Sequence, residues 1–513
     1  MDMSAAAPPG RTEGLAGSAP GVWGIGTVTL GGCLLLALAL RLHGLAAPSP
    51  WVDEIASWTF ARLAWSDLLG PVAHVETNPP GYYALLKLVI GAAGPGEAVM
   101  RLPSAIAGAL AVVPVALVGR RTGGPLAGLF AGGLVAVSAM QIHHSQEARG
   151  YALLFLALAT ALWLAGPMLD HAAGMRRKLA AALGFVLASL TALQLHATAT
   201  IMVAAIFVHA AVVMATRGGG PRRRELALLG GAGLAIMLGD LWWLRLAVGM
   251  VADPASPVAW IERPDLAGSA WVMANVLGGF HLGRLKAAAA GLALSVLVLG
   301  AWLAWRRRNA EAAGLAAGFA FGLVALHGVS QFAPMMLDRT ALALLVFAAP
   351  LGGFAIAALR PRALGMTLAA LLLALSLRGT LSHAQAMAAE GFGEDWRGAI
   401  AALTARAARG DVVLLGNAVQ LGALPLLAPD AVSRLDQRVA RDPADRLDAA
   451  LVKATGLGTW FDPDAACGRT VWPIGRDIEM RSRIEPLALP PPAFAAGFGR
   501  VILRAVPMPA CRG

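Results

Sequence analysis

The sequence predicts an α-helical membrane protein with many spans, followed by a small α/β domain. Three observations lead to this fold class. Hydrophobic residues make up 58% of the 513 residues and charged residues only 14%, whereas a soluble domain is about a quarter charged. The apolar residues form runs of about 20, enough for a helix to cross ~30 Å of hydrocarbon. From residue 382 onward, amphipathic and strand-like patterns replace these runs.

The predicted spans begin after an N-terminal tail at residues 1–21. Eleven apolar runs meet the hydropathy criterion for membrane helices, and they cover residues 22–40, 102–118, 126–142, 151–169, 179–195, 197–215, 226–248, 287–305, 312–329, 340–359 and 364–381. The first run is longer than the apolar core of about 7–15 residues in a signal peptide, although the small residues at 45–47 would suit cleavage. We therefore favour an uncleaved first helix and a membrane domain at residues 22–381.

A shorter apolar segment at residues 82–91 covers only about 15–20 Å as a helix. The distribution of basic residues decides whether this segment crosses the membrane. If this segment stays outside the bilayer, the basic clusters at residues 120–121, 176–178, 222–224, 306–308 and 360–362 all share one side with the N-terminus. Cytoplasmic loops usually carry such clusters. We therefore expect a juxtamembrane helix within a first outer loop at residues 43–100.

The formal net charge of +11 does not indicate a nucleic-acid partner. The Arg and Lys residues lie in short clusters between apolar runs, where they orient helices. A continuous basic binding face is therefore not expected, and the partners we expect are membrane lipids.

Residues 382–513 form the predicted outward domain. Residues 393–410 indicate an amphipathic helix with Trp396, Ile400, Ala401 and Leu403 on one side, and residues 411–416 a short buried strand. Prolines at 490–492 indicate irregular loops near the end. An oxidising compartment would allow the two cysteines of this domain, at positions 467 and 511, to pair, but the sequence fixes no distance between them.

Two adjacent carboxylates, Asp53 and Glu54, follow the first span closely. One interpretation is that they cap an interfacial helix, because acidic groups favour a helix N-terminus and Trp51 and Trp58 suit the interface. The other is that a carboxylate held at the membrane surface deprotonates an acceptor hydroxyl as general base. Both interpretations stay open on the loop sequence alone.

The same loop continues with His74, Glu76 and Asn78, before a double proline that stiffens the chain. A histidine and a carboxylate can ligate a metal, but two ligands at this spacing are weak evidence. Solvated loop residues are the favoured interpretation of His74 and Glu76.

A second outer loop at residues 143–151 contains Glu147 and Arg149. An arginine at a membrane boundary is often only a headgroup anchor. Alternatively, Glu147 holds Arg149 in place to bind a carrier phosphate, a task that suits a planar guanidinium. His143 and His144 are interpreted as polar loop residues, because no cysteine or carboxylate cluster lies beside them.

A third outer loop ends at Asp338 and Arg339, just before the tenth span. Arg339 is a second candidate for phosphate binding, and the alternative is an interfacial arginine paired with Asp338. Asp240 and Arg245 lie near the outer end of the seventh span. Charged groups so close to hydrocarbon usually face a cavity or a partner, and we expect these two at the same cavity.

With these residues in place, the chain resembles bacterial members of the superfamily of protein O-mannosyltransferases and lipid A aminoarabinose transferases. These are membrane glycosyltransferases of the C-type (GT-C) fold, similar to glycosyltransferase family 39. The matching motifs, in order, are WVDE at 51–54, NPPGYY at 78–83, RLPSA at 101–105, SQEARGYAL at 145–153 and residues 334–339. The sequence departs from the commonest pattern at Asn78, where many relatives carry His, and at Thr340, where an aromatic residue often stands.

The resemblance implies inverting transfer of a hexose or pentose from a polyprenyl-phosphate donor to an acceptor hydroxyl or phosphate of the cell envelope. It places the chain in a bacterial inner membrane, with a cytoplasmic N-terminus and a periplasmic C-terminal domain, and it implies no required cofactor, divalent metal being left open. The acidic base of the family maps onto Asp53, with Glu54 beside it. Donor phosphate binding maps onto Arg149 and Arg339, and the supporting residues are Glu147, His74, Glu76, Asn78, Tyr82 and Tyr83.

Two other classes of protein fit parts of the pattern. A secondary transporter also has many spans with a few intramembrane charges. Against this alternative, the polar clusters lie in the outer loops, and two repeated halves with matching interrupted helices are not evident. A noncatalytic scaffold that presents the C-terminal domain is the other alternative. Neither has an evident need for the Asp53 carboxylate, so its substitution separates them from an enzyme.

Overall fold

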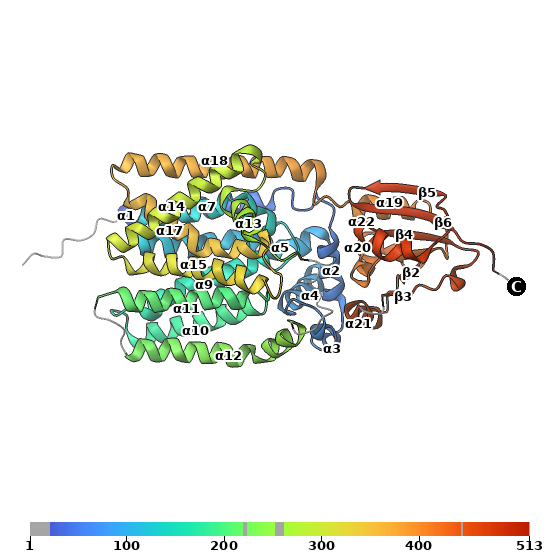
Figure 1. Ribbon diagram of the computed structural model, residues 1–513, viewed down its shortest axis with the longest axis horizontal. Helices are drawn as coiled ribbons and strands as arrows, with labels where there is room; N and C mark the ends of the chain where they lie inside the picture. Colours follow the sequence, from blue (N-terminus) through green and yellow to red (C-terminus); the bar gives the residue numbers. More distant parts are fainter. Residues whose placement is uncertain (1–20, 219–222, 252–260, 443–444, 512–513) are drawn as a thin grey trace, which may run out of the picture.

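The computed structural model describes residues 21–218, 223–251, 261–442 and 445–511. The expected tail at residues 1–20 and Arg222 of the third basic cluster lie outside these residues. The described chain forms a long bundle of helices with a small mixed sheet at one end (Figure 1). The fold class predicted from the sequence is confirmed.

A helix stands at each of the eleven predicted spans. These are α1 (Gly21–Leu42), α5 and α6 (Glu97–Leu110, Val112–Gly123), α7 and α8 (Pro125–Val137, Ala139–Ser145), α9 (Tyr151–Leu169), α10 (Met175–Leu193), α11 (Ala199–Thr216), α12 (Arg223–Val251), α14 (Lys286–Arg306), α15 (Ala310–Ser330), α16 and α17 (Asp338–Ala341, Leu345–Ala358) and α18 (Arg362–Glu390). Within the described residues, eight helices are long and apolar enough to cross a membrane, or nine if the bent pair α7 and α8 is one span. The bend of 55° lies at Ser138, whose hydroxyl accepts the Gln141 N–H and begins α8.

One apolar helix was not predicted. Helix α13 (Leu266–Gly278) has only 13 residues, about 20 Å at ~1.5 Å per residue, and falls short of the ~30 Å that a span needs. It begins at Asp265, whose carboxylate accepts the Gly268 N–H. A hydropathy search for runs of spanning length does not detect such a helix.

Four short helices of the expected first outer loop lie at the end of the bundle that faces the sheet (Figure 1). They are α2 (Val52–Arg62), α3 (Trp65–Leu68), η1 (Val72–His74) and α4 (Gly81–Ala93). Pro79 and Pro80 precede α4, and the rings of Tyr83 in α4 and Phe60 in α2 pack 4.6 Å apart. Helix α4 contains the short apolar segment of the sequence and packs on α2; its juxtamembrane position stays a prediction.

Basic side chains tie helix ends together at the other end of the bundle. Arg121 donates to the Trp163 carbonyl at 2.7 Å and pairs with Glu311 at 3.1 Å. Arg307 donates to the Ala358 carbonyl at 2.6 Å. The Trp163 carbonyl has no helical donor because Pro167, four residues later in α9, has no N–H, and the Ala358 carbonyl is at the end of α17. The two arginines satisfy these carbonyls.

The C-terminal sheet has six strands in the order β3-β2-β1-β4-β6-β5. The strands are β1 (Val412–Leu415), β2 (Asp436–Val439), β3 (Thr459–Trp460), β4 (Thr470–Arg476), β5 (Phe494–Phe498) and β6 (Val501–Pro507). Strands β1 to β4 are parallel, while β6 runs antiparallel to both β4 and β5. All four residues of β1 are buried, as expected for a central parallel strand covered on both faces.

The predicted helix at 393–410 is shorter in the structure. Helix α19 (Trp396–Thr404) begins at Asp395, whose carboxylate accepts the Gly398 N–H at 2.9 Å. Its buried side chains are those of Trp396, Ala399, Ile400 and Leu403. The placement of Ala401 on this buried side was wrong, since the structure exposes it and Ala399, three residues after Trp396, takes that place.

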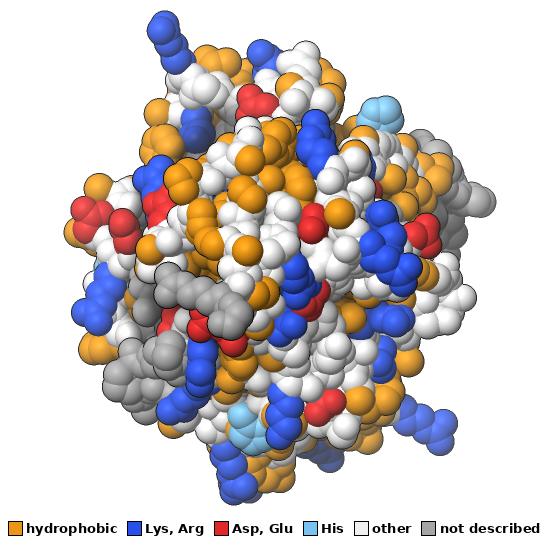
Figure 2. All heavy atoms as spheres, turned by 90° about the vertical axis from the view of Figure 1, so that its right-hand side faces the viewer, with side chains coloured by type: hydrophobic (Ala, Val, Ile, Leu, Met, Phe, Trp, Pro, Cys, Tyr) orange, Lys and Arg blue, Asp and Glu red, His pale blue; other side chains and the backbone are white. Residues whose placement is uncertain are grey.

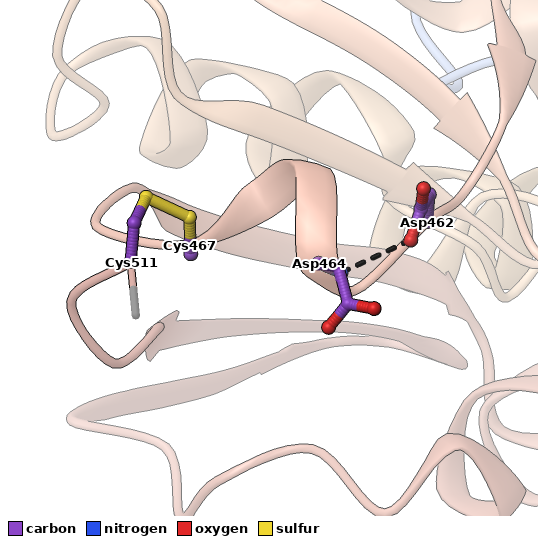
Figure 3. The surroundings of a disulfide bond; sticks show 4 residues. All are labelled: Asp462, Asp464, Cys467 and Cys511. Atoms are coloured by element: carbon purple, nitrogen blue, oxygen red, sulfur yellow. Dashed lines mark hydrogen bonds between the residues drawn. A yellow bond between two sulfur atoms is a disulfide. The ribbon is translucent and has the colours of Figure 1, made fainter. Parts of the chain in front are cut away.

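Cys467 and Cys511 form a disulfide in this domain. Figure 3 shows the bond next to a short turn in which Asp464 donates its N–H to the Asp462 carboxylate at 3.0 Å. The bond ties the end of the chain to the segment that precedes β4. Cys33 in α1 is a free cysteine.

Figure 2 shows the molecule from the end that carries the sheet. Lys and Arg side chains are spread over this face among acidic and apolar groups, and they do not gather in a single patch. The positive net charge is therefore not concentrated at this end.

The C-terminal part contacts helix α2 directly. Glu394, which follows α18, accepts the Val52 N–H and the Trp396 indole N–H, each at 2.9 Å. Thr59 of α2 donates to the Val419 carbonyl at 3.1 Å. Glu394 thereby caps the first turn of α2, where the N–H groups have no partner within the helix.

Candidate active site

A cavity of about 280 Å³ lies where the bundle meets the C-terminal sheet. This volume is near the lower end of the ~300–1,000 Å³ typical of small-molecule sites. Segments that are far apart in the sequence line it, and they contribute Asp53, Ala56, Phe60, Glu76, Thr77, Asn78, Tyr83, Arg149, Tyr151, His196, Ala197, Thr198, Ile261, Pro334, Met335, Leu337, Arg339, Thr340, Val419 and Leu447. The cavity brings together residues of all three predicted outer loops.

Asp53 projects into the cavity from the first turn of α2. Its Oδ2 lies 3.5 Å from Nη1 of Arg339 and 3.9 Å from Nη2 of Arg149. Its side chain keeps 26% of its surface exposed, so an incoming molecule can reach the carboxylate. The helix N-terminus and two guanidinium groups therefore place positive charge on three sides of the Asp53 carboxylate.

Tyr151 holds both arginines over one ring. The guanidinium carbons of Arg149 and Arg339 lie 5.9 and 6.0 Å from the Tyr151 ring centre, within the range of cation–π attraction. Burial by itself lowers the pKa of Arg149, but Tyr151, Tyr83 and Asp53 outweigh it and hold that pKa well above its usual value. Arg149 is therefore a cation at every working pH.

Glu54, although adjacent to Asp53, points away from the cavity. Its carboxylate accepts two hydrogen bonds from Arg101, at 2.7 and 2.6 Å, and one from the Ala148 N–H at 2.8 Å. Arg101 also donates to the Leu45 and Pro48 carbonyls, and both charged side chains are 1% exposed. We had expected Glu54 among the catalytic residues, but its oxygens are engaged and buried, so we assign it a structural role.

Glu76 organises the entry to α4. Its Oε1 accepts the Asn78 N–H at 3.2 Å, the Asn78 side-chain amide at 3.1 Å and the Tyr83 hydroxyl at 3.2 Å. Burial raises the pKa of Glu76, and the positive charge of Arg149 opposes that rise. These contacts fix the loop that lines one wall of the cavity.

His74 and Tyr82 lie outside the cavity lining. His74 is exposed, and its Nδ1 contacts the Gly70 carbonyl at 2.7 Å. The Tyr82 ring is buried against Tyr83, with ring centres 6.1 Å apart. The structure therefore leaves His74 with no evident part in the site, and it gives Tyr82 a packing role.

Glu147 does not hold Arg149 as we expected. Its Oε1 lies 2.9 Å from Nε2 of His143 and its Oε2 lies 3.1 Å from Nδ1 of His144. Burial by itself raises the pKa of Glu147, but the two histidines outweigh it and hold that pKa well below its usual range. Both histidines belong to the last turn of α8 and not to a loop, which corrects their interpretation as polar loop residues.

His196 is a cavity residue that the sequence analysis missed. It lies between α10 and α11, and its Nδ1 contacts the Thr198 hydroxyl at 2.9 Å and accepts the Thr198 N–H at 3.2 Å. Burial, with Arg149 and Arg339 nearby, lowers the pKa of His196 to about 3, so the ring is neutral. A sequence signal for His196 exists in the polar residues Gln194, His196 and Thr198, which stand where the predicted spans 179–195 and 197–215 meet.

The other outer charges have partners of their own. Asp338 accepts hydrogen bonds from the Asn275 amide at 3.0 and 2.9 Å. Asp240 accepts one from the Gln194 amide at 2.8 Å. Asp240 and Arg245, expected at the cavity, are not among the residues that line it.

The bundle, the short helices at its end and the C-terminal sheet can be compared with proteins of known sequence and structure. No protein-family model matches the chain, and no curated protein matches its sequence. Two solved structures of the aminoarabinose transferase ArnT from Cupriavidus metallidurans are similar to it. The apo structure gives a TM-score of 0.66 at 13% identity and covers 94% of this chain and 98% of that chain. The structure bound to undecaprenyl phosphate gives 0.62 at 14% identity and covers 95% and 98%.

The archaeal oligosaccharyltransferase AglB from Archaeoglobus fulgidus is also similar. Its structure with an inhibitory peptide and a dolichol-phosphate gives a TM-score of 0.54 at 14% identity and covers 90% of this chain and 70% of that chain. The fold to which the sequence motifs pointed is therefore confirmed. At these identities the likeness establishes the fold alone.

Proposed function

We propose that the protein is an inverting glycosyltransferase that uses a polyprenyl-phosphate-linked sugar. The observation that carries the proposal is the position of Asp53, which faces Arg149 and Arg339 at the edge of a cavity next to the bundle. A carboxylate suits proton removal from an acceptor, and two guanidinium groups suit a departing phosphate. The fold supports this proposal, since structures of that fold carry undecaprenyl phosphate and dolichol-phosphate.

In the empty cavity Asp53 partly neutralises both arginines. A donor phosphodiester attracts the same two guanidinium groups, so its binding frees the Asp53 carboxylate to accept a proton. The acceptor oxygen then forms a bond to the anomeric carbon on the face opposite the phosphate, while the bond from that carbon to the phosphate oxygen breaks. The acceptor proton passes to Asp53, and the negative charge of the polyprenyl phosphate passes to Arg149 and Arg339.

The neutral His196 and the carboxylate of Glu76 supply further polar contacts in the cavity. Val419 and Leu447 of the C-terminal domain line the same cavity, so this domain takes part in acceptor selection. The transferred sugar is a hexose or pentose, and the acceptor is a hydroxyl or phosphate of the cell envelope. Neither a cofactor nor a metal at Asp53 is required by this scheme.

The site faces the periplasm of a bacterial inner membrane in this proposal. Two observations support the orientation. The basic clusters join helix ends at the far end of the bundle, as cytoplasmic loops do. The disulfide lies in the C-terminal domain, and such bonds persist in oxidising compartments. The N-terminus is then cytoplasmic, residues 22–381 form the membrane domain and residues 382–513 the periplasmic domain.

The test is glycosyl transfer by the purified protein in detergent, with radiolabelled polyprenyl-phosphate sugars and a cell-envelope extract as acceptor. Asp53→Asn keeps the size of the side chain and removes the base, so we expect transfer to fall about 10²–10⁴-fold. Asp67→Asn is the matched control, because Asp67 lies in the same outer loop and outside the cavity lining.

Transfer by the Asp67 variant together with loss in a folded Asp53 variant supports the proposal. Equal transfer by the wild type and the Asp53 variant removes Asp53 from the mechanism. If neither protein transfers any sugar from any donor, the transporter becomes the better hypothesis.

A further inference from the structure

A cluster of imidazole and carboxylate groups lies beside the loop that carries Arg149, outside the cavity lining. One ligand atom from each of His143, His144 and Glu147 lies within 4.8 Å of the other two. His143 is partly buried, and the other two side chains are nearly inaccessible, at 5% and 2% exposure. Two imidazoles and a carboxylate are a donor set that Zn²⁺ favours in proteins.

The spacing of the donor atoms is close to that of a coordination shell. Ligands about 2.0–2.1 Å from a tetrahedral ion lie ~3.4 Å from one another. The two nitrogen–oxygen distances from the histidines to Glu147 are 2.9 and 3.1 Å. These two distances are a few tenths of an ångström shorter than that spacing, and all three ligand atoms lie within 4.8 Å of one another, so small side-chain movements suffice to admit an ion.

Hydrogen bonding leaves this cluster incomplete. Nδ1 of His143 and Nε2 of His144 are buried and have no partner. His383 of α18 is 2% exposed, and neither of its ring nitrogens has a partner. Its ring centre lies 5.1 Å from that of His143. A neutral imidazole carries one N–H donor and one acceptor, so the buried His383 ring leaves both unused, which is unfavourable.

We propose that His143, His144 and Glu147 bind a divalent cation of the zinc class, with His383 as the fourth donor. Such an ion replaces the contacts of Nε2 of His143 and Nδ1 of His144 with Glu147 by coordination bonds, and it gives the buried His383 ring a partner. It joins α8 to α18 and fixes Glu147, two residues before Arg149. The ion is structural in this proposal, and its presence does not depend on the proposed glycosyl transfer.

The experiment uses the full-length protein in detergent, purified through an affinity tag that contains no histidine. The metal content of the purified chain is measured by mass spectrometry, the protein is treated with chelator, and Co²⁺ and then Zn²⁺ are titrated. We expect one equivalent of metal per chain and the intense visible absorption of four-coordinate Co²⁺. Zn²⁺ should displace the Co²⁺, and it should raise the thermal unfolding midpoint of the stripped protein.

The variant is His143→Ala/His144→Ala, and the matched control is His327→Ala. His327 is a half-buried histidine of α15 that contacts the Ser269 hydroxyl at 2.8 Å. The double variant should bind Zn²⁺ more than about 100-fold more weakly, since even partners of metal ligands contribute 10–100-fold. The control should bind like the wild type.

Two results would overturn the proposal. One is that the stripped wild type takes up no Co²⁺ or Zn²⁺, a result that needs no variant. The other is equal affinity in the folded double variant and the wild type. If the double variant does not fold, Glu147→Gln, which keeps the shape of the cluster, replaces it in the same titration. Absence of glycosyl transfer, in contrast, bears on the proposed function alone.

Discussion

Replacing Glu54 with glutamine tests the division of roles between two adjacent carboxylates. The wild-type Glu54 carboxylate and the Arg101 guanidinium share two hydrogen bonds of 2.7 and 2.6 Å in a place where both are 1% exposed. The variant leaves the charge of Arg101 buried and uncompensated. Breaking a buried ion pair in this way costs about 3–5 kcal/mol. We expect the free energy of unfolding to fall by that amount.

The control is Asp477→Asn, which removes an ion pair with Arg481 at the surface of the C-terminal domain. The side chains of that pair are 49% and 71% exposed, and surface pairs contribute about 0–1 kcal/mol. The double variant Glu54→Met/Arg101→Met removes both buried charges and should recover part of the loss, because apolar groups can replace a buried pair. Unfolding by heat and by denaturant in one detergent, followed by fluorescence, measures all four proteins.

The refuting result is specific. If Glu54→Gln unfolds within about 1 kcal/mol of the surface control but no longer transfers sugar, Glu54 is a catalytic residue and its structural assignment is wrong. If its stability falls and the residual folded protein still transfers sugar, the assignment stands.

Three further predictions concern the site and the C-terminal domain. Arg149→Lys should lower kcat/KM for the donor about 10²-fold, because an ammonium group cannot replace the planar guanidinium at a phosphate. The control exchange Arg500→Lys should leave kcat/KM unchanged, and transfer kinetics at varied donor concentration measure both variants. Burial, reinforced by Asp445, raises the pKa of Asp448 to about 7, so between about pH 4 and pH 7 the folded chain holds a proton that the unfolded chain has lost. The stability of the wild type should therefore fall as the pH rises through this window. The fall should be smaller in Asp448→Asn, and thermal unfolding from pH 4 to pH 8 measures both proteins. Cys467→Ser opens a disulfide that joins residues 44 positions apart and should lower the stability of the C-terminal domain by about 2–4 kcal/mol. Denaturant unfolding against oxidised wild type measures this loss, and reduced wild type, which also lacks the bond, should match the variant.

The helices of the membrane domain were predictable because lipid imposes one requirement on every span, which is a long apolar helix. The same requirement explains the omission of α13, an apolar helix of only 13 residues. In the C-terminal domain the strand at 412–415 was evident from its apolar run. The pairing order of the sheet was not, because it depends on contacts between distant strands.

Side-chain direction limited the prediction of the site. Asp53 and Glu54 are neighbours in the sequence, but on a helix they point about 100° apart. One reaches the cavity and the other reaches Arg101, 47 residues along the chain. His143 stands four residues before Glu147, but α8 ends at Ser145, so helical spacing alone does not predict their contact. His196 belongs to no motif, and only the fold brings it to the cavity.

Glu394 restricts how the two parts of the chain can be exchanged or separated. The helix that presents Asp53 is completed at its N-terminus by a carboxylate 342 residues later, so the membrane part is not a self-sufficient module. A chain that ends after α18 at Glu390 leaves the Val52 N–H of that helix without this acceptor. A chimera that takes its C-terminal domain from another protein needs an acidic residue in the same place, or the helix that carries Asp53 loses the cap of its first turn.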